Sequence, residues 1–140
     1  MNAVAVAIAF LALGVSAFSV YVALKKLRLD LFDHRYKVFE ETWSALSRAL
    51  QTDALYLPTN VNNVLPVARF LFPQELFDYV TEVSTNLSRL YVTTMASRSN
   101  GDVVPGDMVK ERGELMQWFA TQASTGCKDR FQPHLDFARW

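Results

Sequence analysis

The chain lacks both an excess of charge and a second cysteine. Its 140 residues carry 14 Lys and Arg against 14 Asp and Glu, so the formal net charge is zero. A nucleic-acid-binding protein normally carries a basic excess that attracts phosphates, and this sequence has none. The lone Cys127 cannot form an internal disulfide. We therefore expect no nucleic-acid partner and no disulfide scaffold, in a chain long enough for one domain.

Glycine-rich loops and strand patterns are also missing. The five glycines are scattered, so the sequence contains no phosphate-binding loop. No period-two alternation extends over a useful length, and the chain has neither an internal repeat nor a low-complexity linker. We expect an all-α protein, in which an N-terminal transmembrane helix is continuous with the first helix of a small cytoplasmic helical bundle.

Charge is absent from the first 24 residues. Residues 3–24 form an apolar run, and a helix of that length covers ~33 Å, enough for a ~30 Å hydrocarbon core. We predict a transmembrane segment at residues 1–24 and a cytoplasmic helical bundle at residues 25–140. The alternative is a cleaved signal peptide with Val15-Ser16-Ala17 as its cleavage site, but a basic n-region is missing and apolar residues continue beyond that site.

Basic residues follow the apolar run and none precedes it. Lys25, Lys26 and Arg28 are the first charged residues after Leu24. The positive-inside rule therefore predicts a single-pass protein with its N-terminus outside and its C-terminal domain in the cytoplasm. An unpaired cysteine fits that compartment. We expect the three basic side chains to anchor the protein to lipid headgroups.

Small residues are ordered within the apolar run. They recur at alternating spacings of four and three, which aligns them on one helix face: Ala5, Ala9, Ala12, Ser16, Ser19 and Ala23. A face of small residues lets the backbone of a second helix approach closely. We predict a helix-packing face for other membrane-protein subunits. The alternative is that frequent Ala and Ser produce the pattern by chance.

A bulky stripe continues beyond the apolar run at the same spacing. Its later members are Leu29, Phe32, Tyr36, Phe39, Trp43, Leu46 and Leu50. No Gly or Pro lies between Gly14 and Pro58, so a helix over about 25–51 should continue the span as one rod of ~70 Å. The aromatic members could line a pigment or haem pocket, but their heptad spacing predicts core.

Three further helices are predicted at about 64–72, 73–98 and 107–125. Pro58 and nearby asparagines indicate a loop before the first of them, with Asn63 as its cap, and Gly126 is the expected C-cap of the last. The expected buried residues are Leu76, Val80, Val83, Leu87 and Leu90 on the second of these helices and Val109, Met116, Phe119, Ala120 and Ala123 on the third. A packed C-terminal tail should follow, containing Phe131, Leu135, Phe137 and Trp140.

The segment LRLDLFDHRYKVFE, residues 27–40, directly follows the apolar run. It resembles the hallmark L-R-L-D-L-F-D-x-R-Y/F-x-V/I-F/Y of an uncharacterised family of short bacterial single-span membrane proteins. Weaker likenesses are Phe70-Leu71-Phe72 and the C-terminal FQPHLD, in which His134 replaces the family's usual Tyr. The resemblance implies the bacterial inner (cytoplasmic) membrane and supplies no activity or catalytic residue. The motif residues are Leu29, Asp30, Phe32, Asp33, Arg35 and Tyr36.

Two interpretations of the polar motif residues stay open. Asp30, Asp33, Arg35 and Lys37 lie just past the predicted membrane surface. They could contact lipid headgroups or a partner, and they could equally pair with one another or within the bundle.

Side chains suited to catalysis or metal binding are isolated. His34 lies beside Asp33 and one turn after Asp30, a pattern typical of a solvated helical face, and no second ligand motif supports a metal site. Cys127 lies near Lys128, which would favour a thiolate, but a cysteine just past a helix is typically a small buried residue. We expect no catalytic, metal-binding or cofactor-binding residues.

These observations favour a noncatalytic, membrane-anchored helical interaction module, an accessory subunit or assembly factor of a larger inner-membrane complex. Its partners would be other membrane-protein subunits, bound through the transmembrane helix, with the bundle as a second candidate surface. The alternative is a membrane-tethered ligand-sensing bundle that binds a lipid or small metabolite in a cavity lined by Phe39, Trp43, Phe77 or Phe119. An enzyme that depends on Cys127 or His34 is a third hypothesis.

Overall fold

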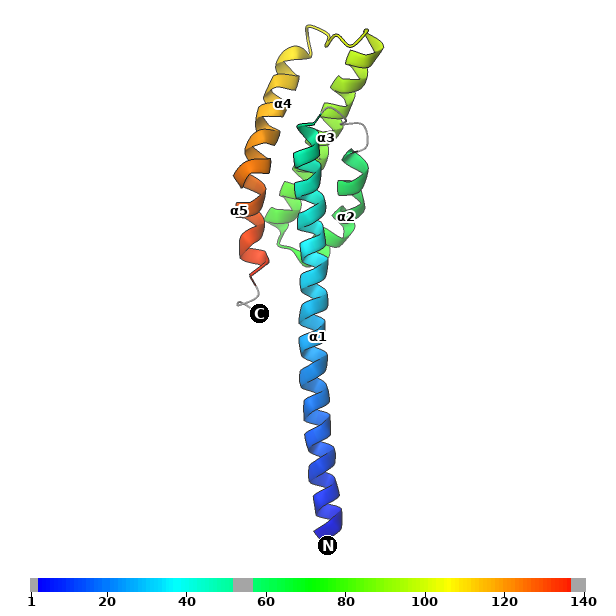
Figure 1. Cartoon of the computed structure of the whole chain (residues 1–140), viewed down its shortest axis with the longest axis vertical. Coiled ribbons are helices and arrows are strands. Elements are labelled where there is room, and N and C mark those ends of the chain that lie inside the picture. Colours follow the sequence, from blue (N-terminus) through cyan, green and yellow to red (C-terminus); the bar gives the residue numbers. More distant parts are fainter. Residues whose placement is uncertain (1–2, 52–56, 137–140) are drawn as a thin grey trace.

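The fold is a helical bundle from which one long helix projects (Figure 1). A computed structural model describes residues 3–51 and 57–136, and within these ranges it contains helices and no strand. The principal helices are α1 (Ala3–Ala49), α2 (Leu57–Leu71), α3 (Gln74–Ser99) and α4 (Val109–Thr121). The predicted all-α class is confirmed.

The helix α1 is continuous from the apolar run into the bundle. Its 47 residues correspond to ~70 Å at 1.5 Å per residue. Residues 3–31 are all exposed, and this half of the helix extends away from the bundle (Figure 1). Among the described residues, α1 is the one helix long and apolar enough to cross a membrane. The predicted rod is therefore present, and it ends at Ala49 rather than at about Gln51.

The buried face of α1 consists mainly of small and β-branched residues. It comprises Val38, Thr42, Ala45, Leu46 and Ala49. Short side chains allow the neighbouring helices to approach the α1 backbone, and α2 and α3 both contact this helix. The Thr42 hydroxyl lies within this face and donates a 2.7 Å hydrogen bond to the Val38 carbonyl, so its burial leaves no unsatisfied polar group.

The aromatic stripe lies beside this face rather than in it. Tyr36 and Trp43 are each 46% exposed, so the prediction that the stripe forms core is wrong for both. Phe32 and Phe39 are half-buried. Trp43 Nε1 donates a 3.2 Å hydrogen bond to the Ala123 carbonyl. Phe39 contacts Phe131, so Phe39 and Trp43 both contact the C-terminal part of the chain, and all four aromatics remain partly exposed.

The helix α2 starts earlier than the sequence pattern suggests. It begins at Leu57, whereas we predicted a loop over residues 52–63 and a helix over about 64–72. The assignment of Asn63 as the capping residue is therefore wrong. Pro66, expected in a first turn, lies in the helix interior.

Packing explains the early start of α2. Val61, Val64 and Ala68 recur at helical spacing and are all buried. Pro58 is the second residue of the helix, a position where its missing N–H removes no helical hydrogen bond. Burial of the apolar face outweighs the preference of asparagine for turns, which is worth only a few tenths of a kcal/mol per residue.

The helix α3 follows the prediction to within one residue at each end. It spans Gln74–Ser99 with Pro73 immediately before its first turn. All five residues of its predicted apolar stripe are buried: Leu76, Val80, Val83, Leu87 and Leu90. The following turn includes Gly101 with φ +67° and Asp102 with φ +64°, a left-handed conformation that glycine adopts without steric cost.

The C-terminal part does not stop at Gly126. After α4, a π-helical turn (Gln122–Gly126), α5 (Cys127–Phe131) and a 3-10 turn (Gln132–His134) continue along the same path (Figure 1). Gly126 has φ −58° and ψ −42°, so it is an ordinary helical residue. Our assignment of Gly126 as the C-cap of a helix over about 107–125 is therefore wrong.

The π-helical turn brings the apolar residues of α4 and α5 onto one face. Cys127 follows Phe119 by eight positions, which in a regular α-helix would place it ~80° further around the axis. The extra residue of a π-helical turn removes ~100° of that rotation. Leu115, Phe119, Cys127 and Phe131 are consequently all buried.

The predicted burial on this segment is partly correct. Phe119 is buried, and Met116 and Ala123 are half-buried. Val109 and Ala120 are exposed because they lie on the outer side of α4, so their predicted burial is wrong.

The tail packs as expected as far as the structure describes it. Phe131 is fully buried against Phe39 and Phe72, with ring centroids 5.4 Å apart in each pair. Leu135 is half-buried against the same core. The remaining two predicted tail residues, Phe137 and Trp140, lie outside the described residues.

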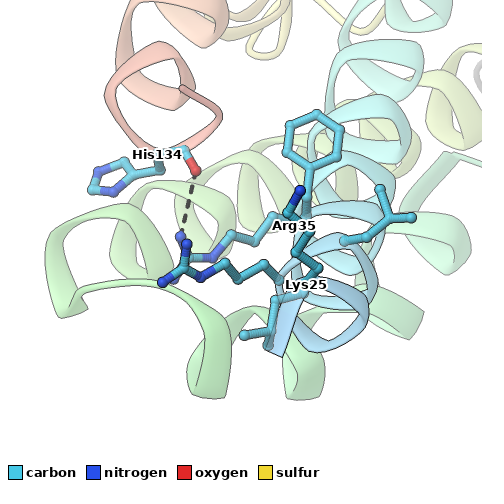
Figure 2. A pocket seen from close by; sticks show the side chains of 7 residues that line it. Lys25, Arg35 and His134 are labelled. Atoms are coloured by element: carbon cyan, nitrogen blue, oxygen red, sulfur yellow. Dashed lines mark hydrogen bonds between the residues drawn. The ribbon is translucent and has the colours of Figure 1, made fainter. Parts of the chain in front are cut away.

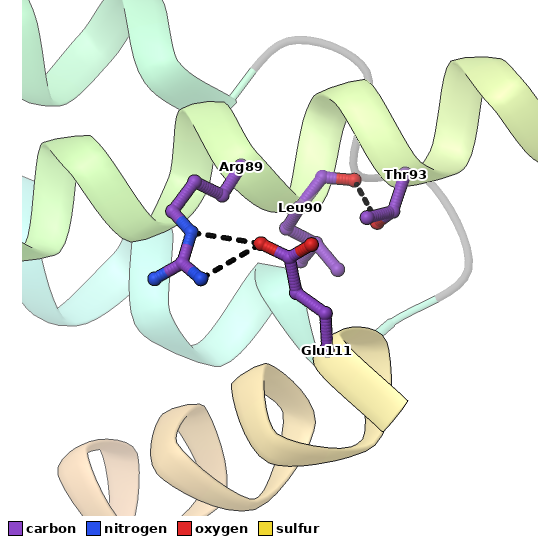
Figure 3. Close-up of polar contacts among 4 residues, drawn as sticks. All are labelled: Arg89, Leu90, Thr93 and Glu111. Carbon is purple, nitrogen blue, oxygen red and sulfur yellow. Dashed lines mark hydrogen bonds and ion pairs between the residues drawn. The ribbon is translucent and has the colours of Figure 1, made fainter. Parts of the chain in front are cut away.

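An ion pair joins α3 to α4 at the surface. Arg89 Nη2 and Nε lie 2.7 Å and 2.9 Å from Glu111 Oε1 (Figure 3). One turn further along α3, the buried Thr93 hydroxyl donates to the Leu90 carbonyl at 2.9 Å (Figure 3). Exposed pairs of this kind contribute roughly 0–1 kcal/mol. The apolar core therefore supplies most of the stability of this helix contact.

Candidate functional site

A pocket of about 390 Å³ lies where α1 leaves the bundle (Figure 2). We call it the junction pocket. Six of its lining residues come from α1 and one from the C-terminal turn: Lys25, Arg28, Leu29, Leu31, Phe32, Arg35 and His134. Its walls are mostly apolar, and none of these residues is acidic.

Helical spacing brings most of the α1 residues onto one side. Positions 25, 29 and 32, and positions 28, 32 and 35, follow one another at spacings of three or four, which places them on the same side of a helix. Lys26, Asp30 and Asp33 lie between them on other faces and do not line the pocket. The side of α1 that lines the junction pocket therefore carries three cations and no carboxylate, and the carboxylates of Asp30 and Asp33 lie away from it.

Arg35 is held at the inner end of the junction pocket. Its Nη1 donates a long hydrogen bond, 3.5 Å, to the carbonyl of His134 (Figure 2). Its guanidinium carbon lies 5.6 Å from the centroid of the Phe72 ring, within the range of a cation–π contact. Burial lowers the pKa of Arg35, yet an arginine remains protonated at physiological pH. The pocket therefore contains a partly desolvated, permanent positive charge.

His134 contributes its ring and its backbone. The ring packs edge-on against Phe72 at 5.9 Å between centroids. Burial, and next the positive charge of Arg35, lower the pKa of His134, while Glu75 acts in the opposite direction. The imidazole is therefore mainly neutral at pH 7. At neutral pH the positive charge of the junction pocket comes from Lys25, Arg28 and Arg35.

The two outer cations are exposed. Lys25 Nζ lies 4.8 Å from the centroid of the Tyr21 ring, one turn back along α1. Within the described part of the chain, no ion pair to an acidic side chain engages Lys25 or Arg28. Both side chains are therefore available to an anion at the mouth of the pocket.

The predicted helix-packing face is exposed along the projecting half of α1. Ala5, Ala9, Ala12 and Ala23 lie there with both serines. The hydroxyl of Ser16 donates to the Ala12 carbonyl, and that of Ser19 donates to the Val15 carbonyl, each at 2.8 Å. Since both hydroxyls are satisfied within the helix, they can lie in an apolar environment at little cost.

The isolated reactive residues lie apart from the junction pocket. His34 is exposed on α1, and among the described residues no group of three His, Cys, Asp or Glu could hold a metal ion. Cys127 is buried in the core. Burial raises the pKa of the Cys127 thiol to about 12, and the nearby Tyr79 hydroxyl opposes this shift only in part. The side chain is therefore a neutral thiol at physiological pH.

The cavity expected for a ligand-sensing bundle differs from the pocket observed. Phe119 is fully buried, and Phe77 is packed against the core. Phe39 borders a separate, open and more polar groove beside α5. The sequence predicts Lys25 and Arg28 as a membrane anchor and Arg35 as a motif residue, and it does not predict that they line one pocket. The seven-residue spacing from Arg28 to Arg35 was the signal that could have joined them.

The chain matches no protein-family model, no curated protein and no solved structure. The resemblance of residues 27–40 to a bacterial family therefore rests on the motif alone and stays a prediction.

Proposed function

We propose that the protein is a noncatalytic, membrane-anchored helical interaction module, an accessory subunit or assembly factor of a larger inner-membrane complex. In this proposal residues 3–24 span the bacterial inner membrane once, with the N-terminus outside and the bundle in the cytoplasm. The observation that carries it is the single helix α1, apolar and exposed in its first half and packed into the bundle in its second. Such a helix fixes the bundle at the membrane surface.

Rigidity is central to the proposal. No Pro or Gly interrupts α1 after Gly14, and kinks generally need one of these residues or a bulge. The second half of α1 contacts α2, α3, α4 and α5. Movement of a partner within the membrane would therefore reach the bundle as tilt or rotation of one body.

The small-residue face supports docking of another transmembrane helix. Without a hydrophobic driving force between helices in lipid, close backbone packing is a main source of association. The exposed face from Ala5 to Ala23 offers such an approach, and its serine hydroxyls are already satisfied. Bulky residues on the adjacent face, such as Leu11 and Val15, would remain toward lipid.

The alternative function, a membrane-tethered bundle that senses a lipid or small metabolite, is favoured by the junction pocket. That pocket combines apolar walls with convergent cations, the usual composition of a site for an anionic amphiphile. The two functions are compatible, because a ligand at the base of α1 would lie between the membrane and the bundle.

Variants on the two faces of the span test the interaction proposal. Ala12→Leu and Ser16→Leu should reduce the amount of partner retained when the tagged full chain is purified in mild detergent. Leu11→Ile and Val15→Leu are the matched controls and should retain it. Equal losses on both faces, or a wild-type protein that purifies alone, would refute docking through the small-residue face.

Cysteine labelling tests the orientation. A reagent that does not cross membranes should label Asn2→Cys in intact cells and spare the native Cys127. Because Cys127 is buried, a Glu40→Cys variant provides an exposed position on the cytoplasmic side. Labelling of Glu40→Cys but not of Asn2→Cys would reverse the proposed topology.

A further inference from the structure

We infer that the junction pocket binds one anionic phospholipid, whose phosphate pairs with Arg28 and Arg35 and whose apolar part packs on Leu29 and Phe32. The inference rests on the proposal that residues 3–24 span a membrane. It goes beyond a general attraction of basic residues to headgroups, because it assigns the phosphate to Arg28 and Arg35 and gives the neighbouring Lys26 no part in the site.

Charge identifies the sign of the ligand. Each charged side chain that lines the junction pocket at neutral pH is a cation, and the carboxylates of Asp30 and Asp33 lie on other faces of α1. Arginine presents planar donors that match phosphate oxygens in pairs, which makes it the preferred residue for this group. Arg28 and Arg35 are two turns apart on one face, so one headgroup can lie between them.

Arg35 is already arranged for an anion. Its guanidinium is positioned by the Phe72 ring and the His134 carbonyl, so little side-chain entropy remains to be lost on binding. It is also half-buried, and an ion pair is stronger where water is partly excluded. These two features distinguish Arg35 from an ordinary basic residue at a membrane surface.

Apolar surface identifies the ligand as an amphiphile. Leu29 and Phe32 line the junction pocket between the cations. The same side of α1 continues through exposed Tyr21 and Leu24 into the apolar half of the helix. A free phosphate would leave this surface exposed to water, whereas a phospholipid covers it with glycerol and acyl carbons.

The depth of the site fits the headgroup layer. Arg28 lies four residues beyond Leu24, ~6 Å along the helix, and the headgroup layer of one leaflet is about 5–8 Å thick. Arg35 lies ~16 Å beyond Leu24, but helical side chains slope toward the N-terminus. Its guanidinium therefore extends back toward the membrane.

The end of α2 supports a placement of the bundle against the headgroup layer. The α2–α3 connection and the C-terminal turn lie at the end of the bundle from which α1 projects (Figure 1). Phe72 at this connection contacts both Arg35 and His134. Nearby Phe70 is 87% exposed, and an exposed Phe ring at a membrane surface can be buried at the boundary between headgroups and acyl chains. An exposed aromatic at this end is thus expected if the end rests on headgroups.

Photocrosslinking tests the site in the full chain. The protein is reconstituted in phosphatidylcholine nanodiscs that contain a photoactivatable phosphatidylglycerol, and the crosslinked residues are mapped by mass spectrometry. We expect labelling of Leu29, Phe32 or their neighbours, and a roughly tenfold lower yield for Arg28→Gln, the scale of one lost charge-assisted contact. Lys26→Gln is the matched control, with the same charge change at nearly the same depth, and should lose less than about twofold.

Three results would overturn the inference. Equal losses for Arg28→Gln and Lys26→Gln would mean a diffuse attraction to the surface without a site. Equal labelling by a photoactivatable phosphatidylcholine would mean that charge is not recognised. Suppression of labelling by sodium phosphate at constant ionic strength would identify free phosphate as the ligand in place of a lipid. Arg28 is exposed, and unchanged thermal melting of its variant verifies the fold.

Membrane flotation of the same samples separates this inference from the proposed function. A protein that floats with the vesicles but is not labelled at the junction pocket would refute the lipid site alone. A protein that fails to insert would refute the membrane anchor, and the lipid site with it.

Discussion

The Arg35 guanidinium on α1 donates to the backbone carbonyl of His134 in the C-terminal turn, although 99 positions separate the two residues in the sequence. The contact joins the part of α1 nearest the projecting helix to the last described turn of the chain. Phe72, from the α2–α3 connection, contacts both residues. Three distant segments thus meet at the base of α1, and two of them, α1 and the C-terminal turn, line the junction pocket.

Substitution on the small buried face of α1 should destabilise the bundle. Ala45 is 3% exposed in the packed half of α1, and Ala45→Leu would force α2 or α3 to move. We expect a loss of about 1–3 kcal/mol in the free energy of unfolding, measured by chemical denaturation. Glu40→Leu adds the same side chain on an exposed face of α1 and should change stability by less than about 0.5 kcal/mol. Similar losses in both variants would contradict the assigned buried face.

Gly126→Ala should leave stability unchanged or raise it by up to ~1 kcal/mol. Gly126 has helical dihedral angles, so alanine removes the entropic cost of a helical glycine once the flexible Gln122 side chain has moved aside. Gly101→Ala is the contrasting variant, because φ +67° strains any residue with a Cβ, and it should cost about 1 kcal/mol. Thermal unfolding of the two variants measures both effects. A marked loss for Gly126→Ala would restore its assignment as a C-cap.

Cys127 should be unreactive in the folded protein and should make stability fall at alkaline pH. Burial raises the pKa of this thiol to about 12 from an ordinary value of 9.0. The folded state then retains a proton that the unfolded state loses, so stability is fully present below pH 9 and decreases by up to ~1.4 kcal/mol per pH unit between about 9 and 12. Denaturation at several pH values measures the slope, and Cys127→Ala should reduce it.

Thiol titration gives an independent check on Cys127. A disulfide reagent at pH 8 should modify Cys127 only after guanidinium is added. Rapid modification of the native protein would contradict its burial and would revive the hypothesis of a reactive cysteine.

Local sequence patterns predicted the elements whose burial follows from helical spacing alone. The α3 stripe from Leu76 to Leu90 is such a case, because the helix has one apolar face and that face packs against the core. The start of α2 was missed because Pro58 and its neighbouring asparagines favour a turn locally, whereas packing of Val61 decides the outcome. A short segment of sequence does not reveal the tertiary contacts that its residues make.

The junction pocket could be predicted only in part for the same reason. The cations at positions 25, 28 and 35 share a helical face by spacing. The part of the pocket that α1 contributes could therefore be predicted from the sequence. The position of His134 at the junction pocket depends on the π-helical turn at Gln122–Gly126 and on the path of α5. A one-residue change of helical register has no distinct sequence pattern here, and Gly126 was therefore taken as a stop.

Insertion of two glycines after Lys26 should uncouple the bundle from the projecting half of α1. Each interior glycine costs ~1 kcal/mol of local helix stability, and the insertion also rotates the two halves relative to each other by ~200°. Retention of the proposed partner should fall, while the thermal melting of the bundle stays close to wild type. Insertion of two alanines is the control for rotation without flexibility. A fully functional two-glycine variant would mean that the bundle is merely tethered.

The continuity of α1 from its projecting half into the bundle is the central claim, and a distance between two spin labels tests it most directly. Labels at Leu13→Cys and Glu40→Cys, in a Cys127→Ala background, lie on the projecting and the packed halves of α1. For the full chain in nanodiscs, double electron–electron resonance should give one narrow distribution centred at ~40 Å, the rise of an unbroken helix between these positions. A broad distribution, or one shifted to clearly shorter distances, would show a hinge at Lys25-Lys26 and contradict the rigid rod.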